Sequence, residues 1–274
     1  MAATVSLPNG MTVACLQKYE VPLINMEIES YFAGGLRVQP GDTVFDVGAN
    51  IGLFSLAAYA HCAGNLRLYA FEPVRPIFEV LDANVRRNAS GPQFQLFNFG
   101  LSDRAGSVPF AYYPRAPVLS TAYADEAADL QVMESVVLNN LIHLEVAPLP
   151  LRCLRWVPEP LRVPLVRHGL ERALQAETVI CELRTLSQIV AEHAIERIDL
   201  LKIDVEKAEL DVLRGIAAAD WRKIRQLAVE LHDVGDRLST IRALLRDHGM
   251  TEVALEQPPT LKHSNIYTLF ALRR

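Results

Sequence analysis

The sequence predicts an α/β fold built on a doubly wound, mostly parallel β-sheet. Three observations carry this prediction: short β-type runs alternate with helical stretches, one run passes through a glycine-containing turn into an apolar helix, and the alternation breaks only once. With 274 residues the chain is long for one ordinary α/β domain and short for two. We therefore expect one core domain, 41–274, that carries an insertion and an N-terminal segment.

The expected elements alternate along the chain. A helix is expected over 21–32, where apolar residues recur at helical spacing until Gly34 and Gly35 end the pattern, and it belongs to an N-terminal accessory segment, 1–40. The expected strands are the β-type runs 43–47, 66–71, 94–99, 200–203, 226–231 and 266–272. The expected helices include 77–88, 209–216 and 238–248. Strands and helices in this order join by right-handed crossovers into a parallel sheet.

The alternation breaks between about Tyr112 and Glu182. This stretch contains two proline-rich pieces and a helix-like segment over 122–141. Roughly 70 residues exceed the length of an ordinary connecting loop, so we expect an insertion with its own structure. Ligands of doubly wound sheets bind outside the carboxyl ends of the strands, and an insertion that starts there tends to cover them. We expect 112–182 to be a lid or acceptor-binding module, with an oligomer contact as the alternative.

Composition excludes several classes of protein. Apolar residues make up 50% of the chain and charged residues 22%, which is typical of a soluble globular protein, and a net charge of −5 gives no indication of a nucleic-acid partner. The first ten residues lack a signal pattern, and no apolar run approaches the roughly 18 residues needed to span a bilayer, so a cytoplasmic location is the default. The cysteines form no C-x-x-C pair, so we expect neither a structural zinc site nor a disulfide framework.

The stretch VFDVGANIGLFSLAAYA, residues 44–60, indicates a binding site. A strand that ends in D-x-G-x-N-x-G and continues as a helix exposes backbone N–H groups, and glycines leave room for a ligand. The spacing is not that of a dinucleotide or phosphate loop, so a nucleoside fits better than a phosphate. Glu72, at the end of the second strand, is placed to accept hydrogen bonds from ribose hydroxyls. The alternative is a turn followed by a surface glutamate.

The segments VFDVGANIGLFS, YAFEP, FGLSD and LLKIDVEKAELDVLRGI resemble the FkbM-type S-adenosylmethionine-dependent methyltransferases. The segments LPNGMTVACLQKYE and LAVELHDVGDRLSTIRALLRDHGM resemble the subgroup found as O-methyltransferase modules of polyketide and mixed peptide–polyketide assembly lines. The resemblance implies a class I (Rossmann-like) methyltransferase fold, with a seven-stranded sheet whose last strand is antiparallel. Many relatives of this type have glycine where this chain has Lys207, and this departure leaves the acceptor open.

The resemblance also implies the residues that contact the cofactor, S-adenosyl-L-methionine. Those expected around its methionine part are Asp46, Gly48, Asn50 and Gly52. Glu72 would hold the ribose, and Ser102 and Asp103, which follow the third strand, would lie by the adenine. Asp204 would contact either the methionine amino group or the acceptor.

The expected catalytic residues lie at the ends of the fourth and fifth strands. Glu230 and His232 are two residues apart, so they face the same way on a strand, and His232 suits the role of general base for O-methylation. Its carboxylate partner is Glu206, Glu230 or Asp233, and we favour Glu206 because it comes from the adjacent strand end. For Asp204 and Glu206 the alternative is capping of the following helix. The remaining histidines have no such context, although His143 lies in the insertion.

The expected reaction is transfer of a methyl group to a hydroxyl, and specifically to the β-hydroxyl of an intermediate on an acyl carrier protein. One alternative acceptor is a free small molecule or sugar. From a different class, the chain would be an inactive binding module, which would have no need for His232 and its carboxylates. Asp204, Glu206, His232 and Asp233 are also hard ligands that a divalent ion accepts, but strand ends carry carboxylates without metal too, so we assign no metal site.

Overall fold

The computed structural model describes residues 3–33, 35–89, 91, 93–139, 153–257, 261 and 264–273. Residues 140–152 of the expected insertion, which include His143, lie outside this range. None of the described helices is long and apolar enough to cross a membrane.

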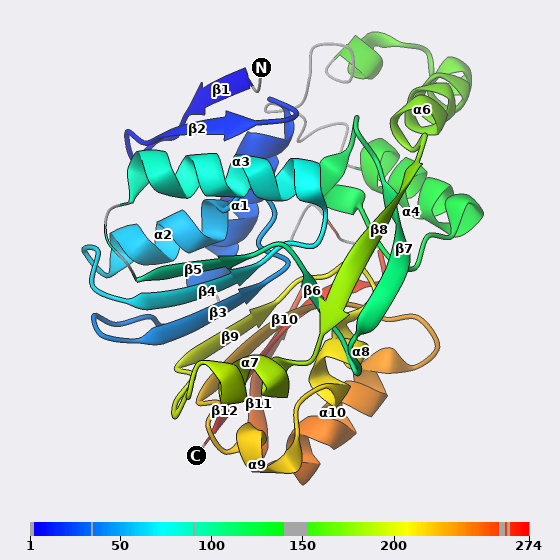
Figure 1. The fold of residues 1–274 in the computed structure, drawn as a ribbon. Helices are drawn as coiled ribbons and strands as arrows, with labels where there is room; N and C mark the ends of the chain where they lie inside the picture. Colours follow the sequence, from blue (N-terminus) through cyan, green and yellow to red (C-terminus); the bar gives the residue numbers. More distant parts are fainter. Residues whose placement is uncertain are drawn as a thin grey trace.

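The centre of the described fold is a seven-stranded sheet with the order β11-β12-β10-β9-β3-β4-β5 (Figure 1). Its strands are β3 (Thr43–Val47), β4 (Arg67–Phe71), β5 (Phe94–Phe97), β9 (Leu200–Ile203), β10 (Gln226–His232), β11 (Met250–Glu256) and β12 (Ile266–Arg273). β12 runs antiparallel to both of its neighbours, and the pairs from β10 to β5 are parallel. The predicted fold class is therefore confirmed. Among these seven strands, only β11 falls where the sequence analysis named no strand.

Helices cover both faces of this sheet because successive strand residues point to opposite sides. Val44 and Leu200 pack in one apolar cluster, whereas Phe45 and Leu201 pack in the other. Figure 1 shows the two helical layers on opposite sides of the sheet. The first layer consists of α1 (Glu20–Ala33), α2 (Leu53–His61) and α3 (Arg75–Asn88), and the second of α7 (Leu186–Glu192), α8 (Glu209–Arg214), α9 (Ala218–Trp221) and α10 (Arg237–Asp247).

A short hairpin of β1 (Ala3–Ser6) and β2 (Thr12–Cys15) precedes α1. The buried side chain of Asn84 on α3 holds it in place. Its amide oxygen accepts the N–H of Ala14 at 2.6 Å, and its amide nitrogen donates to the carbonyl oxygens of Ala14 and Ile51, each at 2.9 Å. One side chain thus ties the N-terminal segment to the turn that follows β3.

The insertion grows out of a second, smaller sheet in the described residues. It has the order β6-β8-β7, formed by β6 (Gly100–Leu101), β7 (Gly106–Tyr112) and β8 (Glu177–Arg184). Between β7 and β8 the structure places η1 (Pro117–Leu119), α4 (Glu126–Asn139), η3 (Leu154–Trp156) and α6 (Glu159–Ala173). Figure 1 shows α4 and α6 at the far end of the β7–β8 pair, away from the large sheet. The expected insertion, 112–182, thus begins at the last residue of β7 and ends inside β8.

Candidate cofactor and acceptor site

The turn after β3 needs glycine at two positions. Gly48 has a φ of +77°, and a Cβ atom there would lie 1.7 Å from the backbone oxygen of Asp204. Gly52 has a φ of +87°, and its Cβ would lie 2.5 Å from Cδ1 of Leu81 on α3. Glycine therefore lets the carboxyl ends of the neighbouring strands β3 and β9 meet, and it lets α2 start close to α3.

Glu72 follows β4 and fixes this turn. Its Oε2 accepts the backbone N–H of Asn50 at 3.1 Å, and its Oε1 accepts that of Val74 at 2.9 Å. Burial raises the pKa of Glu72 to about 7, although the two backbone hydrogen bonds act in the opposite direction. A carboxylate oxygen can accept more than one hydrogen bond, so Glu72 keeps acceptor capacity for the hydroxyls of a ribose.

A buried lysine that the sequence analysis did not single out joins the ends of β3 and β9. The Lys202 ammonium lies 3.3 Å from Oδ1 of Asp46 and 3.1 Å from Oδ2 of Asp204, and it donates to the carbonyl oxygen of Gly48 at 3.0 Å. Burial acts to lower the pKa of Lys202, but the surrounding carboxylates raise it above its ordinary value. Ser55 Oγ donates to the other oxygen of Asp46 at 2.6 Å. Asp46 thus lies beneath the turn, with Oδ2 hydrogen-bonded to Ser55 and Oδ1 facing the Lys202 ammonium without a hydrogen bond of its own.

His232, the last residue of β10, is held on both sides by carboxylates. Its Nε2 lies 3.3 Å from Oε2 of Glu206, and its Nδ1 lies 3.1 Å from Oε1 of Glu209 in α8. Arg237 contacts the other oxygen of Glu209 at 3.1 Å. Burial acts to lower the pKa of His232, but the hydrogen bonds and charges of Glu206 and Glu209 raise it to about 10, well above the ordinary value near 6.5. These two carboxylates therefore favour the protonated imidazole at neutral pH.

The other candidate partners of His232 have different contacts. Glu230 lies on the same strand, but its carboxyl group hydrogen-bonds with Glu27 of α1. Burial, reinforced by the charge of Glu27, raises the pKa of Glu230 well above its ordinary value, and the two carboxyl groups titrate as a pair. Asp233 accepts the backbone N–H of Leu238 at 3.0 Å, at the start of α10. Of the three partners left open by the sequence, Glu206 is the one in contact, and Glu209 was missed.

A cavity of about 480 Å³ lies beyond the carboxyl ends of β3, β4 and β9. It gathers most of the predicted site residues, namely Gly48, Asn50, Glu72, Ser102, Asp103, Asp204 and Glu206. The start of the insertion forms another part of the wall with Pro117, Val118, Ser120, Ala122 and Tyr123. The remaining predicted residues, Asp46, Gly52, Glu230 and His232, stand behind the wall and do not line it.

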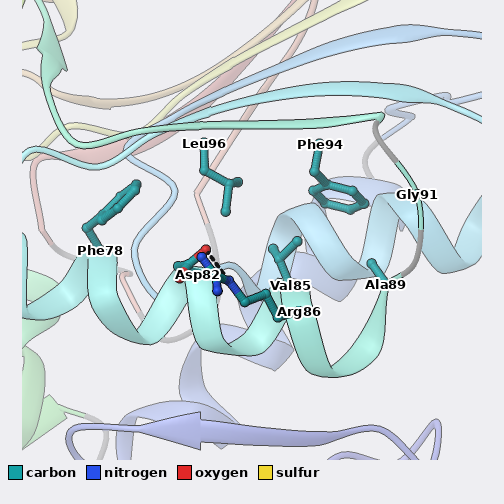
Figure 2. A pocket seen from close by; sticks show the side chains of 8 residues that line it. All are labelled: Phe78, Asp82, Val85, Arg86, Ala89, Gly91, Phe94 and Leu96. Carbon is teal, nitrogen blue, oxygen red and sulfur yellow. Dashed lines mark hydrogen bonds and ion pairs between the residues drawn. The ribbon is translucent and has the colours of Figure 1, made fainter.

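A second hollow, of about 610 Å³, lies between α3 and the edge strand β5 (Figure 2). Its lining is mostly apolar, and the only charged groups in it are Asp82 and Arg86, which pair with each other at 2.9 Å. No predicted site residue lies there. Since its charges satisfy each other, this hollow offers no converging polar groups and carries no chemistry.

The described residues contain no group of three or more His, Cys, Asp or Glu side chains arranged to hold a metal ion. The cysteines within them are free, with Cys15, Cys62 and Cys181 buried and Cys153 exposed.

The chemistry of the cavity fits the cofactor that the resemblance implies. Among the side chains that line it, Glu72, Asp103, Asp204 and Glu206 are acidic and only Arg104 is basic. Such a lining offers acceptors for hydroxyl and ammonium groups and opposes a phosphate. A nucleoside that carries a positive charge, as S-adenosylmethionine does, is therefore the class of ligand that these residues suit.

Comparisons with known proteins agree with this geometry. Residues 46–251 match the model of the methyltransferase FkbM domain. The chain is 38% identical to the 31-O-demethyl-FK506 methyltransferase FkbM of Streptomyces tacrolimicus, over 98% of this chain and 96% of that protein. It is 39% identical to the AMB antimetabolite synthetase AmbE of Pseudomonas aeruginosa, over 98% of this chain but only 12% of that much longer protein. A solved structure of a methyltransferase FkbM from Methylobacillus flagellatus is 16% identical, with a TM-score of 0.49 over 87% of this chain and 45% of that one. The family model and the first of these relatives place the chain in the FkbM methyltransferase family, whose members are S-adenosylmethionine-dependent enzymes.

Proposed function

We propose that this methyltransferase transfers the methyl group of S-adenosylmethionine to a hydroxyl oxygen. The observation that carries the proposal is the position of His232, which lies behind the cavity and contacts Glu206 in its wall at 3.3 Å. The same cavity is lined by Glu72 and Asn50. A potential nucleoside site thus lies in the cavity, and a potential base is linked to the same cavity through Glu206.

In the proposed complex, Glu72 accepts the ribose hydroxyls, and the backbone around Gly48 and Asn50 contacts the methionine part. Ser102 and Asp103 lie by the adenine, and Asp204 contacts the methionine amino group. The bound cofactor supplies an electrophilic methyl group. Lys202 supports this arrangement from below, because it holds Asp204 and the carbonyl oxygen of Gly48 together.

His232 is the proposed general base. As the new O–C bond forms and the C–S bond breaks, the hydroxyl proton leaves the acceptor oxygen, and Nε2 of a neutral imidazole can take it. Glu209 fixes the proton on Nδ1 and stabilises the imidazolium that results. Glu206, which both lines the cavity and contacts Nε2, orients the acceptor hydroxyl. Because Glu206 and Glu209 raise the pKa of His232 to about 10, the base is available mainly in alkaline solution or after the acceptor changes its surroundings.

The proposed acceptor is the β-hydroxyl of an acyl intermediate tethered to an acyl carrier protein. The similarity to a segment of a synthetase, AmbE, supports this class of acceptor. The insertion supports it as well, since its first residues form part of the cavity wall and its helices would act as the lid. A free small-molecule hydroxyl is the second candidate, because the relative named for 31-O-demethyl-FK506 matches this chain over 96% of its length.

A mass-spectrometric assay tests both candidates. The full chain is incubated with S-adenosylmethionine and either carrier-bound β-hydroxyacyl thioesters or the matching free β-hydroxy acids. We expect a gain of one methyl group on the carrier-bound substrates, its loss in His232→Ala, and its retention in His61→Gln, which changes an exposed histidine at the end of α2. Methylation of the free acids alone would favour the second candidate. Methylation on carbon or nitrogen would contradict the proposed reaction.

A further inference from the structure

Two consecutive residues after β9, Glu206 and Lys207, have left-handed backbone conformations with φ of +49° and +77°. In the part of the chain that the structure describes, no other two consecutive non-glycine residues both have positive φ. This conformation is unfavourable for a residue with a side chain, because Cβ comes too close to the carbonyl oxygen that follows. Contacts from elsewhere in the molecule must therefore hold this loop in place.

The start of the insertion supplies those contacts. Thr121 Oγ1 donates to the carbonyl oxygen of Glu206 at 2.5 Å. The Lys207 ammonium donates to the carbonyl oxygen of Tyr123 at 3.2 Å and forms an ion pair with Asp129 of α4. The side chains of this ion pair are only 16% and 19% exposed, so solvent screens it less than an ordinary surface pair.

The carboxylates that contact His232 lie in this loop and at the first residue of α8. Glu206 reaches Nε2, and the backbone N–H of Lys207 donates at 2.7 Å to the Glu209 oxygen that lies next to Nδ1. The side chain of Lys207 does not line the cavity, whereas the side chains on either side of it, Glu206 and Ala208, do. A change in the conformation of Lys207 would therefore disturb both carboxylates without removing a group that touches the cofactor.

We propose that Lys207 is a positioning residue for methyl transfer, because its ion pair with Asp129 docks the insertion onto this loop and keeps Glu206 and Glu209 around His232. The proposal rests on the proposed role of His232 as the base. The position of α4 then controls whether Glu206 and Glu209 contact His232. These contacts are complete only while Asp129 of α4 pairs with Lys207.

The decisive measurement is an NMR titration of the His232 imidazole in the full chain, with no acceptor present. The native midpoint is expected at about 10. In Lys207→Met the direct loss of a positive charge would raise the pKa of His232, whereas the loss of its carboxylate contacts would lower it. We expect the midpoint to fall by at least about one pKa unit, toward the ordinary value of roughly 6.5.

Matched variants separate positioning from other effects. Asp129→Asn should lower the midpoint similarly, and the double variant should go no further, because both changes break one contact. Lys207→Arg keeps the charge and should keep the native midpoint. Glu126→Gln removes an exposed acid from the first turn of α4 and should change nothing. The ionisable groups around His232 are the same in all these variants, namely Glu206, Glu209, Arg237 and Glu230.

An unchanged or raised midpoint in Lys207→Met would overturn the proposal. If that variant does not fold, Lys207→Gly gives the same test, since glycine relaxes the strained backbone and removes the ammonium. In an assay with a carrier-bound β-hydroxyacyl substrate, Lys207→Met should lower kcat about tenfold or more while KM for S-adenosylmethionine changes less than about threefold. A lowered midpoint in a chain that methylates no hydroxyl would support the positioning role and contradict only the proposed function.

Discussion

His232 and Glu209 lie in contact across the junction between β10 and α8, with 3.1 Å between Nδ1 and Oε1. Since Glu206 contacts the opposite ring nitrogen, both nitrogens of the protonated imidazole donate to carboxylates. This clamp orients the ring but also holds its proton, so the group proposed as a base begins as an acid. The rate of methyl transfer should therefore depend on the pH at which His232 loses this proton.

The rate of methyl transfer should increase with pH well into the alkaline range. Only the neutral imidazole can accept a proton, and Glu206 and Glu209 raise the pKa of His232 to about 10. We expect kcat to rise from neutral pH with a midpoint far above 6.5, and His232→Ala to lower kcat by roughly 10²-fold or more. Stopped assays across the pH range measure both. Near-native turnover by His232→Ala at saturating acceptor would move the base to another residue.

Replacing Glu209 should lower the midpoint of the pH–rate profile. Glu209→Gln removes one of the two carboxylates that raise the pKa of His232, so the rate should reach its plateau at a lower pH. The plateau itself should fall, because Gln orients the imidazole less well and does not stabilise its cation. Glu252→Gln, in which the partly exposed partner of Arg242 is changed, serves as the control. If the midpoint of the pH–rate profile is the same in Glu209→Gln as in the native enzyme, Glu209 does not raise the pKa of His232.

Binding of S-adenosylmethionine should depend on the ionised form of Glu72. Glu72→Ala should cost about 1–3 kcal/mol of cofactor affinity, as expected for a lost charged hydrogen bond. In the native protein, affinity should weaken as the pH falls below the Glu72 pKa of about 7, because protonation removes acceptor capacity. Calorimetry at several pH values measures this, with Glu79→Gln, an exposed change on α3, as the control. Unchanged affinity in a folded Glu72→Ala would remove the ribose assignment.

Lys202 should matter for stability far more than a surface lysine does. Lys202→Met leaves the carboxylates of Asp46 and Asp204 without their buried partner, which should lower the free energy of unfolding by about 3–5 kcal/mol. Lys223→Met breaks a more exposed pair with Asp220 and should cost about 1 kcal/mol or less. Urea unfolding compares the two variants. Equal effects would mean that Lys202 is not the link between β3 and β9.

Removal of the insertion should separate cofactor binding from methyl transfer. Tyr112 and Glu177 are paired neighbours in β7 and β8, so a short turn between them can replace 113–176 without disturbing the register. The shortened chain should fold and bind S-adenosylmethionine within about tenfold of the native affinity, because most of its proposed contacts come from the core. Methyl transfer should be lost. A chain that neither folds nor binds the cofactor would show that the insertion belongs to the core.

The features predicted from the sequence are those whose signals are local. The glycine turn, Glu72 and the approach of Glu206 to His232 follow from residues at the ends of strands, where neighbouring parallel strands bring their carboxyl ends together. Lys202 and Glu209 were not predicted as site residues, because their roles depend on tertiary contacts. A lysine within LLKID is unremarkable until Asp46 lies beside it, and a glutamate in the first turn of a helix resembles a simple capping residue.

The missed strands have a similar explanation. β8, with the sequence ETVICELR, shows no strict alternation of apolar and polar residues, and it pairs with β7 across the whole insertion, so its partner is not evident from nearby sequence. β1 and β2 contain four residues each and depend on Asn84 of α3 for their attachment. These strands form because distant segments pair with one another. The periodicity of residues within a short window of sequence does not show such pairing.

The order of strands also has a consequence during synthesis. Thr43, at the start of β3, donates its backbone N–H to Asp199, 156 residues later, just before β9. While the ribosome makes the insertion, β3, β4 and β5 can already pair, but one edge of β3 stays open, and open edges invite association with other nascent chains. Asp46 is the fourth of the five residues of β3. Until Lys202 has been synthesised, the Asp46 carboxylate lacks its ammonium partner, and the cost of removing an unpaired charge from water opposes burial of this part of β3 against another chain.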